Sequence, residues 1–321
     1  SNADNHTLSD TVRGPALALY SDLVNTEHAS TIRIQSFNDD GFTTGSSGDT
    51  NTSGRTFCAW CWKAGGNSNT FNVDGTGYAT ASAAGITNGS IALTGASVNQ
   101  EAGFSIVSYT STGSAGTVGH GLGKRPKVVL IKRRTGANTN WPMWFDGVST
   151  NTDKVMQLNL TNGEAAAAVF FNSGDTTTTT FPLGSGGGQT NDSDGNSDSY
   201  IAYVWAEIEN FSKFGSYTGT GGTDGGCVYC GFKPAFLMIK RTDTTGEWWM
   251  YDSSRGPTNP IPRMLMANNT SDEQEDSSSY LLDFLSNGFK WRSGLAASNG
   301  SGGSFIFMAF AESPFQTANA K

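Results

Sequence analysis

Charged residues, cysteines and histidines are all scarce in this sequence of 321 residues. Charged side chains make up 15% of the chain, against about 25% in an average soluble domain. The net charge is −8, and the longest basic runs are Lys132-Arg133-Arg134 and Lys240-Arg241, which excludes the basic patch of a nucleic-acid-binding surface. No apolar run approaches the roughly 18 residues of a membrane-spanning helix. We therefore expect neither a nucleic-acid partner nor a membrane span.

Glycine and aromatic residues are abundant instead. The chain holds 41 glycines, 19 phenylalanines, 8 tryptophans and 9 tyrosines, a composition typical of short β-strands joined by tight turns. Apolar runs such as 127–131 and 235–239 show no polar alternation, so both faces of their strands should be covered, as in two packed sheets. The sequence therefore predicts an all-β fold of tandem β-sandwich units, jelly-roll or lectin-like.

An internal repeat organises these strands. Two copies align at an offset of 108 residues, and the matching segments are 108–113 with 216–221, Pro126 with Pro234, and Lys132-Arg133 with Lys240-Arg241. Each copy then reaches a tryptophan cluster and closes on an apolar strand that ends in Ala-Glu, at Glu207 and Glu312. We predict complete units at 104–211 and 212–315.

The first part of the chain carries only the back half of such a unit. Residues 10–14 match residues 252–256 as Asp-x-x-Arg-Gly, and residues 37–42 match residues 284–289. The sequence thus predicts an N-terminal partial unit over 4–66, followed by a linker or peripheral hairpin over 67–103. Either the chain begins inside a unit, or another chain supplies the missing strands.

Several motifs together resemble a known family. They are residues 60–66 (Trp-Cys-Trp-Lys-Ala-Gly-Gly), 103–110, 119–123 (Gly-His-Gly-Leu-Gly), 252–256 and 286–290. These segments resemble a family of repetitive structural proteins of marine tailed bacteriophages, whose units occur in tail-fibre-like and other virion proteins. The resemblance spans nearly the whole chain. It implies a virion component made in the host cytoplasm, with other virion proteins as partners, and no known catalysis.

The aromatic residues of the two copies are the candidate ligand-binding residues. They are Trp141, Trp144, Trp248, Trp249 and Tyr251. Aromatic faces suit the apolar faces of sugar rings, so the cluster could bind a host surface glycan, but large core residues or a subunit contact fit the same pattern. Because neighbouring residues on a strand face opposite ways, Trp248 and Trp249 suggest that at least one ring is exposed.

One loop has the spacing of a calcium site. Asp192, Asp194, Asn196 and Asp198 place oxygen ligands at every second residue, as calcium loops do. Tyr203 stands where the closing bidentate Glu of an EF-hand would be. The segment therefore fits either a bound calcium ion or a solvated polar loop, and no other cofactor is expected.

The candidate catalytic and metal-binding residues do not form a recognisable catalytic or metal-binding motif in the sequence. His120 lies in a Gly-His-Gly turn, but the second copy has Val228 at that position, which favours a turn residue over a general base. The acids Glu207 and Glu312 recur in the two copies. They fit either structural partners for Lys or Arg or the paired carboxylates of glycoside hydrolysis. The pairs Cys58/Cys61 and Cys227/Cys230 fit a four-cysteine zinc site less well than buried free thiols.

These patterns predict a non-enzymatic phage virion protein, a tail-fibre or surface module for architecture or host-surface glycan binding. A surface-polysaccharide depolymerase and a calcium-dependent lectin are the alternatives. Virion fibres are commonly three-fold symmetric, so we expect a homo-oligomer, with a trimer considered first.

Overall fold

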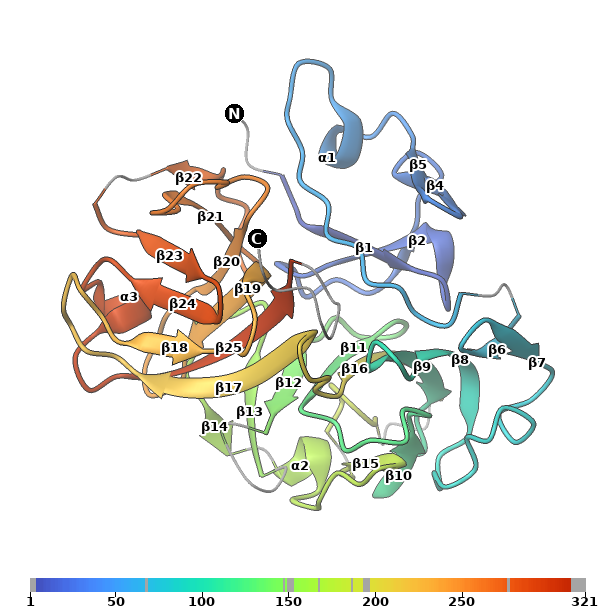
Figure 1. The fold of residues 1–321 in the computed structure, drawn as a ribbon. Coiled ribbons are helices and arrows are strands. Elements are labelled where there is room, and N and C mark those ends of the chain that lie inside the picture. Colours follow the sequence, from blue (N-terminus) through green and yellow to red (C-terminus); the bar gives the residue numbers. More distant parts are fainter. Residues whose placement is uncertain are drawn as a thin grey trace.

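The structure is a computed structural model, and it describes residues 4–66, 69–146, 148, 153–166, 168–185, 187–192, 197–275 and 278–312. The described chain is all-β, with short strands and three helices of four residues each. Figure 1 shows three groups of strands arranged around a common centre. We call them the N-terminal unit (4–66), the first complete unit (104–211) and the second complete unit (212–312).

The second complete unit consists of a six-stranded sheet and a three-stranded sheet. The six-stranded sheet has the order β17 (Ser212–Thr218), β25 (Ser304–Ala311), β19 (Pro234–Arg241), β20 (Trp248–Asp252), β21 (Arg263–Met266) and β22 (Gln274–Glu275). The smaller sheet has the order β18 (Cys227–Tyr229), β24 (Gly288–Trp291) and β23 (Leu282–Leu285), and helix α3 (Ala296–Asn299) precedes β25.

The first complete unit repeats this strand order. Six strands of its larger sheet lie in the order β9 (Phe104–Thr110), β16 (Ser199–Trp205), β11 (Val128–Arg133), β12 (Pro142–Phe145), β13 (Lys154–Gln157) and β14 (Ala165–Ala166). Its smaller sheet pairs β10 (Gly116–Gly119) with β15 (Thr180–Leu183), next to α2 (Ala168–Phe171). The larger sheets of the two complete units therefore share one order of six strands.

The N-terminal unit contains the later strands of the same arrangement. Its three-stranded sheet has the order β1 (Thr7–Asp10), β2 (Gly14–Tyr20) and β3 (His28–Ala29), and β4 (Ile34–Asn38) pairs with β5 (Gly41–Thr44) before α1 (Gly48–Asn51). In chain order these elements correspond to β20, β21, β22, β23, β24 and α3. Counterparts of β17, β18 and β19 are absent from the described residues of this unit.

The segment 67–103, of which 67 and 68 lie outside the described residues, was expected to be a linker or a peripheral hairpin. It contains one hairpin, of β6 (Phe71–Val73) and β7 (Thr76–Tyr78). It also contains β8 (Leu93–Asn99), which pairs along its length with β9 and was not expected. The larger sheet of the first complete unit therefore has nine strands. The sequence did not predict β8, because its apolar alternation is weak and its buried positions include the small residues Ala96 and Ser97.

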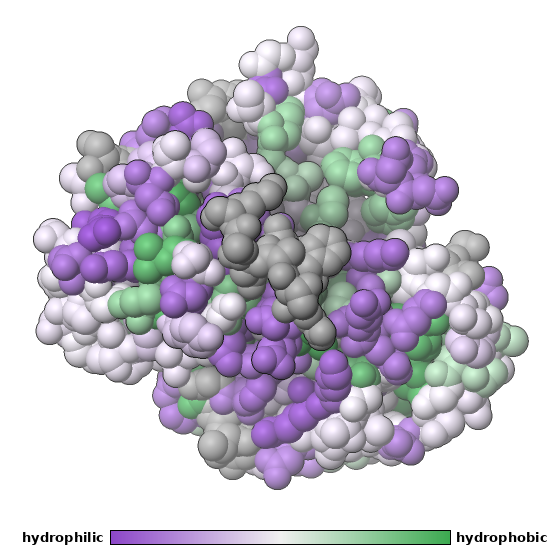
Figure 2. Space-filling view, viewed as in Figure 1, coloured by the Kyte–Doolittle hydropathy of each residue, from purple (hydrophilic) through white to green (hydrophobic). Residues whose placement is uncertain are grey.

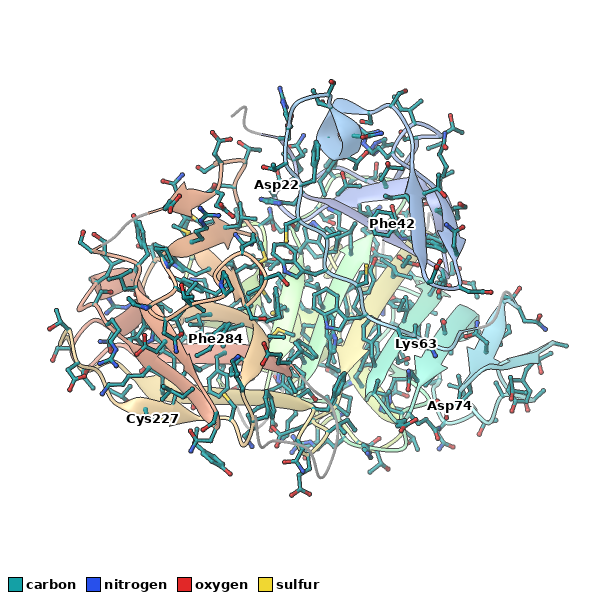
Figure 3. All side chains as sticks on the ribbon, turned by 45° about the horizontal axis from the view of Figure 1, so that its top comes forward. Asp22, Phe42, Lys63, Asp74, Cys227 and Phe284 are labelled. Atoms are coloured by element: carbon teal, nitrogen blue, oxygen red, sulfur yellow. The ribbon has the colours of Figure 1, made fainter. Side chains whose placement is uncertain are left out.

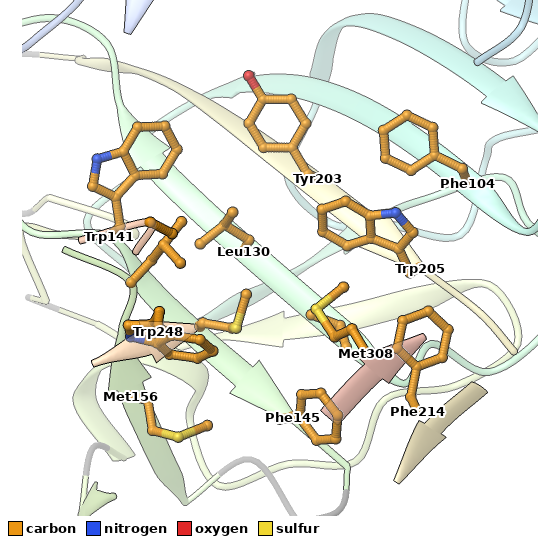
Figure 4. Packing of buried hydrophobic residues seen from close by; sticks show 14 of the residues in the cluster. Phe104, Leu130, Trp141, Phe145, Met156, Tyr203, Trp205, Phe214, Trp248 and Met308 are labelled. Atoms are coloured by element: carbon orange, nitrogen blue, oxygen red, sulfur yellow. The ribbon is translucent and has the colours of Figure 1, made fainter. Parts of the chain in front are cut away.

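Buried apolar residues cover both faces of the larger sheets. In β11, Val128 and Leu130 belong to one cluster, whereas Val129 and Ile131 belong to another beneath the β10–β15 sheet. The first of these, which we call the central cluster, holds residues of all three units. Figure 4 shows part of it, with residues of the two complete units labelled. The strands lack polar alternation because a smaller sheet packs on the outer face and the other units pack on the inner face.

Candidate functional site

The five predicted ligand-binding aromatic residues are all buried. Trp141, Trp144, Trp248, Trp249 and Tyr251 are each at most 4% exposed. Trp248 faces the central cluster, and its neighbour Trp249 faces the cluster beneath the smaller sheet, so both sides of β20 are covered. The prediction of a glycan platform is therefore wrong for these residues, since none presents a ring face to solvent. Trp141 and Trp248 lie in the central cluster between units, and the other three lie beneath the smaller sheet of their own unit.

Two of these tryptophans instead join one unit to the next. The indole Nε1 of Trp141 donates to the main-chain carbonyls of Tyr20 (2.9 Å) and Leu23 (3.1 Å) in the N-terminal unit. The Nε1 of Trp248 donates to the carbonyl of Gln157 (3.0 Å) in the first complete unit. The ring of each tryptophan thus packs among apolar residues of the central cluster, while its Nε1 donates to the backbone of the preceding unit.

His6 makes the third contact of this kind. Its Nε2 lies 3.0 Å from the carbonyl oxygen of Asn269 in the second complete unit. His6 occupies the place of Trp141 and Trp248, because the main-chain nitrogens of Ser21, Leu158 and Ala267 donate to His6, Trp141 and Trp248, respectively. The three units therefore contact one another in a closed ring with an approximate three-fold relation.

A polar side chain fixes the start of each of these strands. The main-chain nitrogens of Trp141 and Trp248 donate to the Oδ1 atoms of Asn159 (3.0 Å) and Asn268 (2.8 Å). The nitrogen of His6 donates in the same way to Asp22 (2.9 Å), which Figure 3 labels. The repeat in the sequence did not point to Asp22, Asn159 and Asn268. Each follows directly after Ser21, Leu158 or Ala267, and this shared position is the sequence feature that could have identified them.

Two recurring lysines reinforce the contacts between units. Lys132 Nζ donates to the carbonyl of Val24 (2.8 Å), and Lys240 Nζ donates to the carbonyl of Thr161 (3.0 Å). Both lysines are fully buried. Burial lowers the pKa of Lys132 to about 7 and that of Lys240 to about 8. The lysine of each recurring Lys-Arg pair thus contributes to the ring.

A buried ionic cluster lies where the N-terminal unit meets the first complete unit. Arg13 Nε donates to Asp10 Oδ2 at 2.5 Å, and the Tyr203 hydroxyl donates to the same oxygen at 2.7 Å. Burial alone would raise the pKa of Asp10, but Arg13 and Tyr203 together hold it below its ordinary value. Asp252 has the matching contact, since Trp60 Nε1 donates to its Oδ2 at 3.3 Å. The Asp-x-x-Arg-Gly motif is therefore structural.

The described carboxylates of the acidic loop bind an arginine. Asp192 and Asp198 both pair with the guanidinium of Arg133, and Thr135 Oγ1 donates to Asp198 at 2.9 Å. Asp194 and Asn196, the other two predicted calcium ligands, lie outside the described residues. Within the described part of the chain, no group of three His, Cys, Asp or Glu residues has the arrangement of a metal site. These contacts favour an arginine-closed loop.

The histidine and the cysteines have structural surroundings. His120 is fully buried, its Nδ1 accepts from the Leu122 nitrogen at 3.2 Å, and burial lowers its pKa to about 4. It lies directly after β10, and its ring is buried rather than exposed. All four cysteines are free thiols, and the expectation of buried thiols is wrong for three, because only Cys230 is buried. Burial raises the pKa of Cys230 to about 12, so its nucleophilic thiolate is disfavoured.

The recurring glutamates are bound to lysines. Glu207 pairs with Lys213 at 2.7 Å, and Glu312 pairs with Lys233 at 2.8 Å, which confirms the structural interpretation of both acids. A shallow hollow of about 430 Å³ between the complete units contains two other carboxylates, Glu164 and Asp243. Each of these has its own cation, Lys154 or Arg241. Both carboxylates of this hollow are thus held by cations.

The fold and these contacts define an all-β protein in which three related units close into a ring through buried side chains and main-chain carbonyls. The chain belongs to the family described as Domain of unknown function (DUF7483), whose model matches residues 1–314. No curated protein and no solved structure matches the chain. None of the described helices has the length and apolar character needed to cross a membrane.

Proposed function

We propose that the protein is a non-enzymatic structural module of a tailed-phage virion, of the tail-fibre or surface type. The resemblance of the sequence motifs to virion structural proteins supports the phage assignment. The observation that carries the structural role is that the polar residues recurring between units are used in contacts within or between them. Lys132 and Lys240, for example, bind carbonyls of the neighbouring unit.

The buried asparagines support the same role. Asn191 Oδ1 accepts from the Thr112 nitrogen, and Asn299 Oδ1 accepts from the Thr220 nitrogen. Each amide nitrogen also donates to two carbonyls. In an enzyme, some recurring polar groups would face a substrate, whereas these are buried and satisfied within the fold.

Immunogold labelling of purified virions with antibody against the chain tests this proposal. We expect gold at a constant position on the particle, whereas virions without gold label would contradict a virion role.

A reducing-sugar assay on host surface polysaccharide tests the non-enzymatic part of the proposal. No turnover is expected, and turnover abolished by one Asp or Glu substitution would overturn the non-enzymatic assignment.

The homo-oligomer stays a prediction, which light scattering at several protein concentrations checks.

A further inference from the structure

A glutamate stands at the same place in all three units. Glu27, Glu164 and Glu273 directly precede the equivalent strands β3, β14 and β22. The main-chain nitrogens of the first two also donate to carbonyls of the next unit, those of Arg134 (3.0 Å) and Thr242 (2.8 Å). The three glutamates are therefore equivalent, and the groups around their carboxylates can be compared.

Arginines bind two of these glutamates. The carboxylate of Glu27 accepts two hydrogen bonds of 3.0 Å from the guanidinium of Arg134, and the guanidinium of Arg13 lies 3.4 Å from it. The carboxylate of Glu273 accepts from Arg255 at 2.9 Å. Both glutamates thus bind an arginine of their own unit, and Glu27 binds a second arginine from the next unit.

Glu164 has neither of these arginines. Val148 follows its strand β12 by three residues, which is the position of the arginine in the other two units. Thr242 stands in the place of Arg134, at the repeat offset of 108 residues. Within the described residues, the one cation that pairs with Glu164 is Lys154, whose Nζ donates to Oε1 at 2.5 Å. The lysine side chain is 40% exposed, so this ion pair contributes little.

The hollow between the complete units opens at the place of the two arginines. It has a volume of about 430 Å³, and Val148, Glu164 and Thr242 all line it. Its other polar lining residues include Ser216, Thr218, Asp243 and Ser304. In Figure 2 the two units meet at the lower left of the molecule, among mostly polar side chains. The volume lies within the range of roughly 300–1,000 Å³ that is typical of small-ligand sites.

We propose that this hollow binds a guanidinium group carried on a small ligand, with Glu164 as its main partner. A planar guanidinium donates two parallel hydrogen bonds to a carboxylate, as Arg134 does to Glu27. Lys154 leaves the site open, because the equivalent Glu27 binds two cations at once. A small ligand fits better than one protein side chain, because the hollow occupies the place of two arginines. The site does not depend on the virion assignment.

Calorimetric titration of the full chain with agmatine, in buffer of low ionic strength, tests the proposal. Agmatine carries a guanidinium on a short alkyl amine, and putrescine has an amine in place of that guanidinium at the same charge. We expect saturable one-to-one binding of agmatine and at least ten-fold weaker binding of putrescine. No binding of agmatine, or equal binding of both cations, would overturn the proposal. A Gly-Arg-Gly peptide that binds more tightly than agmatine would overturn the assignment to a small ligand.

Three variants make the site assignment specific. Glu164→Gln should weaken agmatine binding at least ten-fold and keep the melting temperature, since its ion pair with Lys154 is partly exposed. Glu312→Gln removes another partly exposed carboxylate that is paired with a lysine, outside the hollow, and should bind agmatine like the wild type. Thr242→Arg should raise the melting temperature and prevent agmatine binding, because its guanidinium takes the place that Arg134 has beside Glu27. Equal loss in both Gln variants, or wild-type binding in T242R, would contradict the site.

Discussion

The buried lysines are the residues at which the ring should respond to pH. In the folded chain the pKa of Lys132 is about 7 because of burial, whereas an unfolded lysine titrates near 10.5. Between these values the unfolded state binds more protons, so the free energy of unfolding must rise with pH. Below about pH 7 both states are protonated, and the full cost of burying the charge is present. The burial of Lys132 is therefore least costly in alkaline solution, in which the folded amine is neutral.

Replacing Lys132 by Met should remove part of this pH dependence. The free energy of unfolding of the wild type, measured by urea titration from pH 7 to 8, should rise by up to about 1.4 kcal/mol per pH unit relative to the variant. Lys240 titrates near 8 in the folded chain, so it contributes mainly above this window. Lys213→Met, which removes a partly exposed ion pair, is the control and should keep the wild-type slope. Parallel profiles for wild type and K132M would contradict the assignment.

Arg133 determines how the acidic loop should respond to calcium. Its guanidinium pairs with the carboxylates of Asp192 and Asp198, so both ends of the loop already contact a positive charge. We expect the melting temperature to be the same in EDTA and in millimolar calcium, and to fall in Arg133→Met, which leaves the carboxylates to repel each other. Calcium stabilisation that is abolished by Asp194→Ala would instead support the lectin alternative.

Strand elements were largely predictable, but the contacts between them were not. The apolar cores of β11 and β19 recur at a fixed offset, so the sequence predicts the paired larger sheets. The ring contacts could not be predicted from the sequence, because their acceptors are main-chain carbonyls, which every residue type has. Their donors also differ in chemistry, as His6 stands in the position of Trp141 and Trp248. Only the hydrogen bonds of the folded chain reveal this equivalence.

The ionic cluster at the end of β1 should be sensitive to the loss of its arginine. Arg13→Met leaves the buried Asp10 carboxylate uncompensated, and we expect a loss of about 3–5 kcal/mol in the free energy of unfolding at pH 7. Tyr203→Phe removes one hydrogen bond to the same oxygen and should cost about 1–2 kcal/mol. Denaturant titration of the two variants measures both losses.

Acid should reduce the effect of Arg13→Met. In the wild type, the folded pKa of Asp10 lies below its unfolded value near 3.8, so the stabilisation is present above that pH and is lost on acidification. In the variant, burial raises the folded pKa of Asp10, so the carboxyl group binds a proton more readily and its penalty falls as the pH approaches 4. The wild-type advantage should therefore shrink between pH 7 and pH 4. An advantage independent of pH would show that lost packing, not charge, causes the destabilisation.

The three units should unfold as one cooperative molecule. Residues of all three units meet in the central cluster, and each unit donates to a carbonyl of another. Opening one unit would expose apolar surface of its neighbours and leave buried polar groups without partners, so intermediates with one unit unfolded are costly. Calorimetry should show a single transition in which the calorimetric and van't Hoff enthalpies agree.

A mutation in the N-terminal unit tests the coupling of this cooperative ring. Trp62 contacts Phe236 and Phe310 across the centre, so Trp62→Ala should remove about 2–4 kcal/mol. If the units are coupled, the single transition moves to lower temperature by several degrees without splitting. Val169→Ala, at an exposed site, should leave it in place. A separate low-temperature transition in W62A would mean that the N-terminal unit unfolds alone, since a weakly coupled unit loses its structure before the other two.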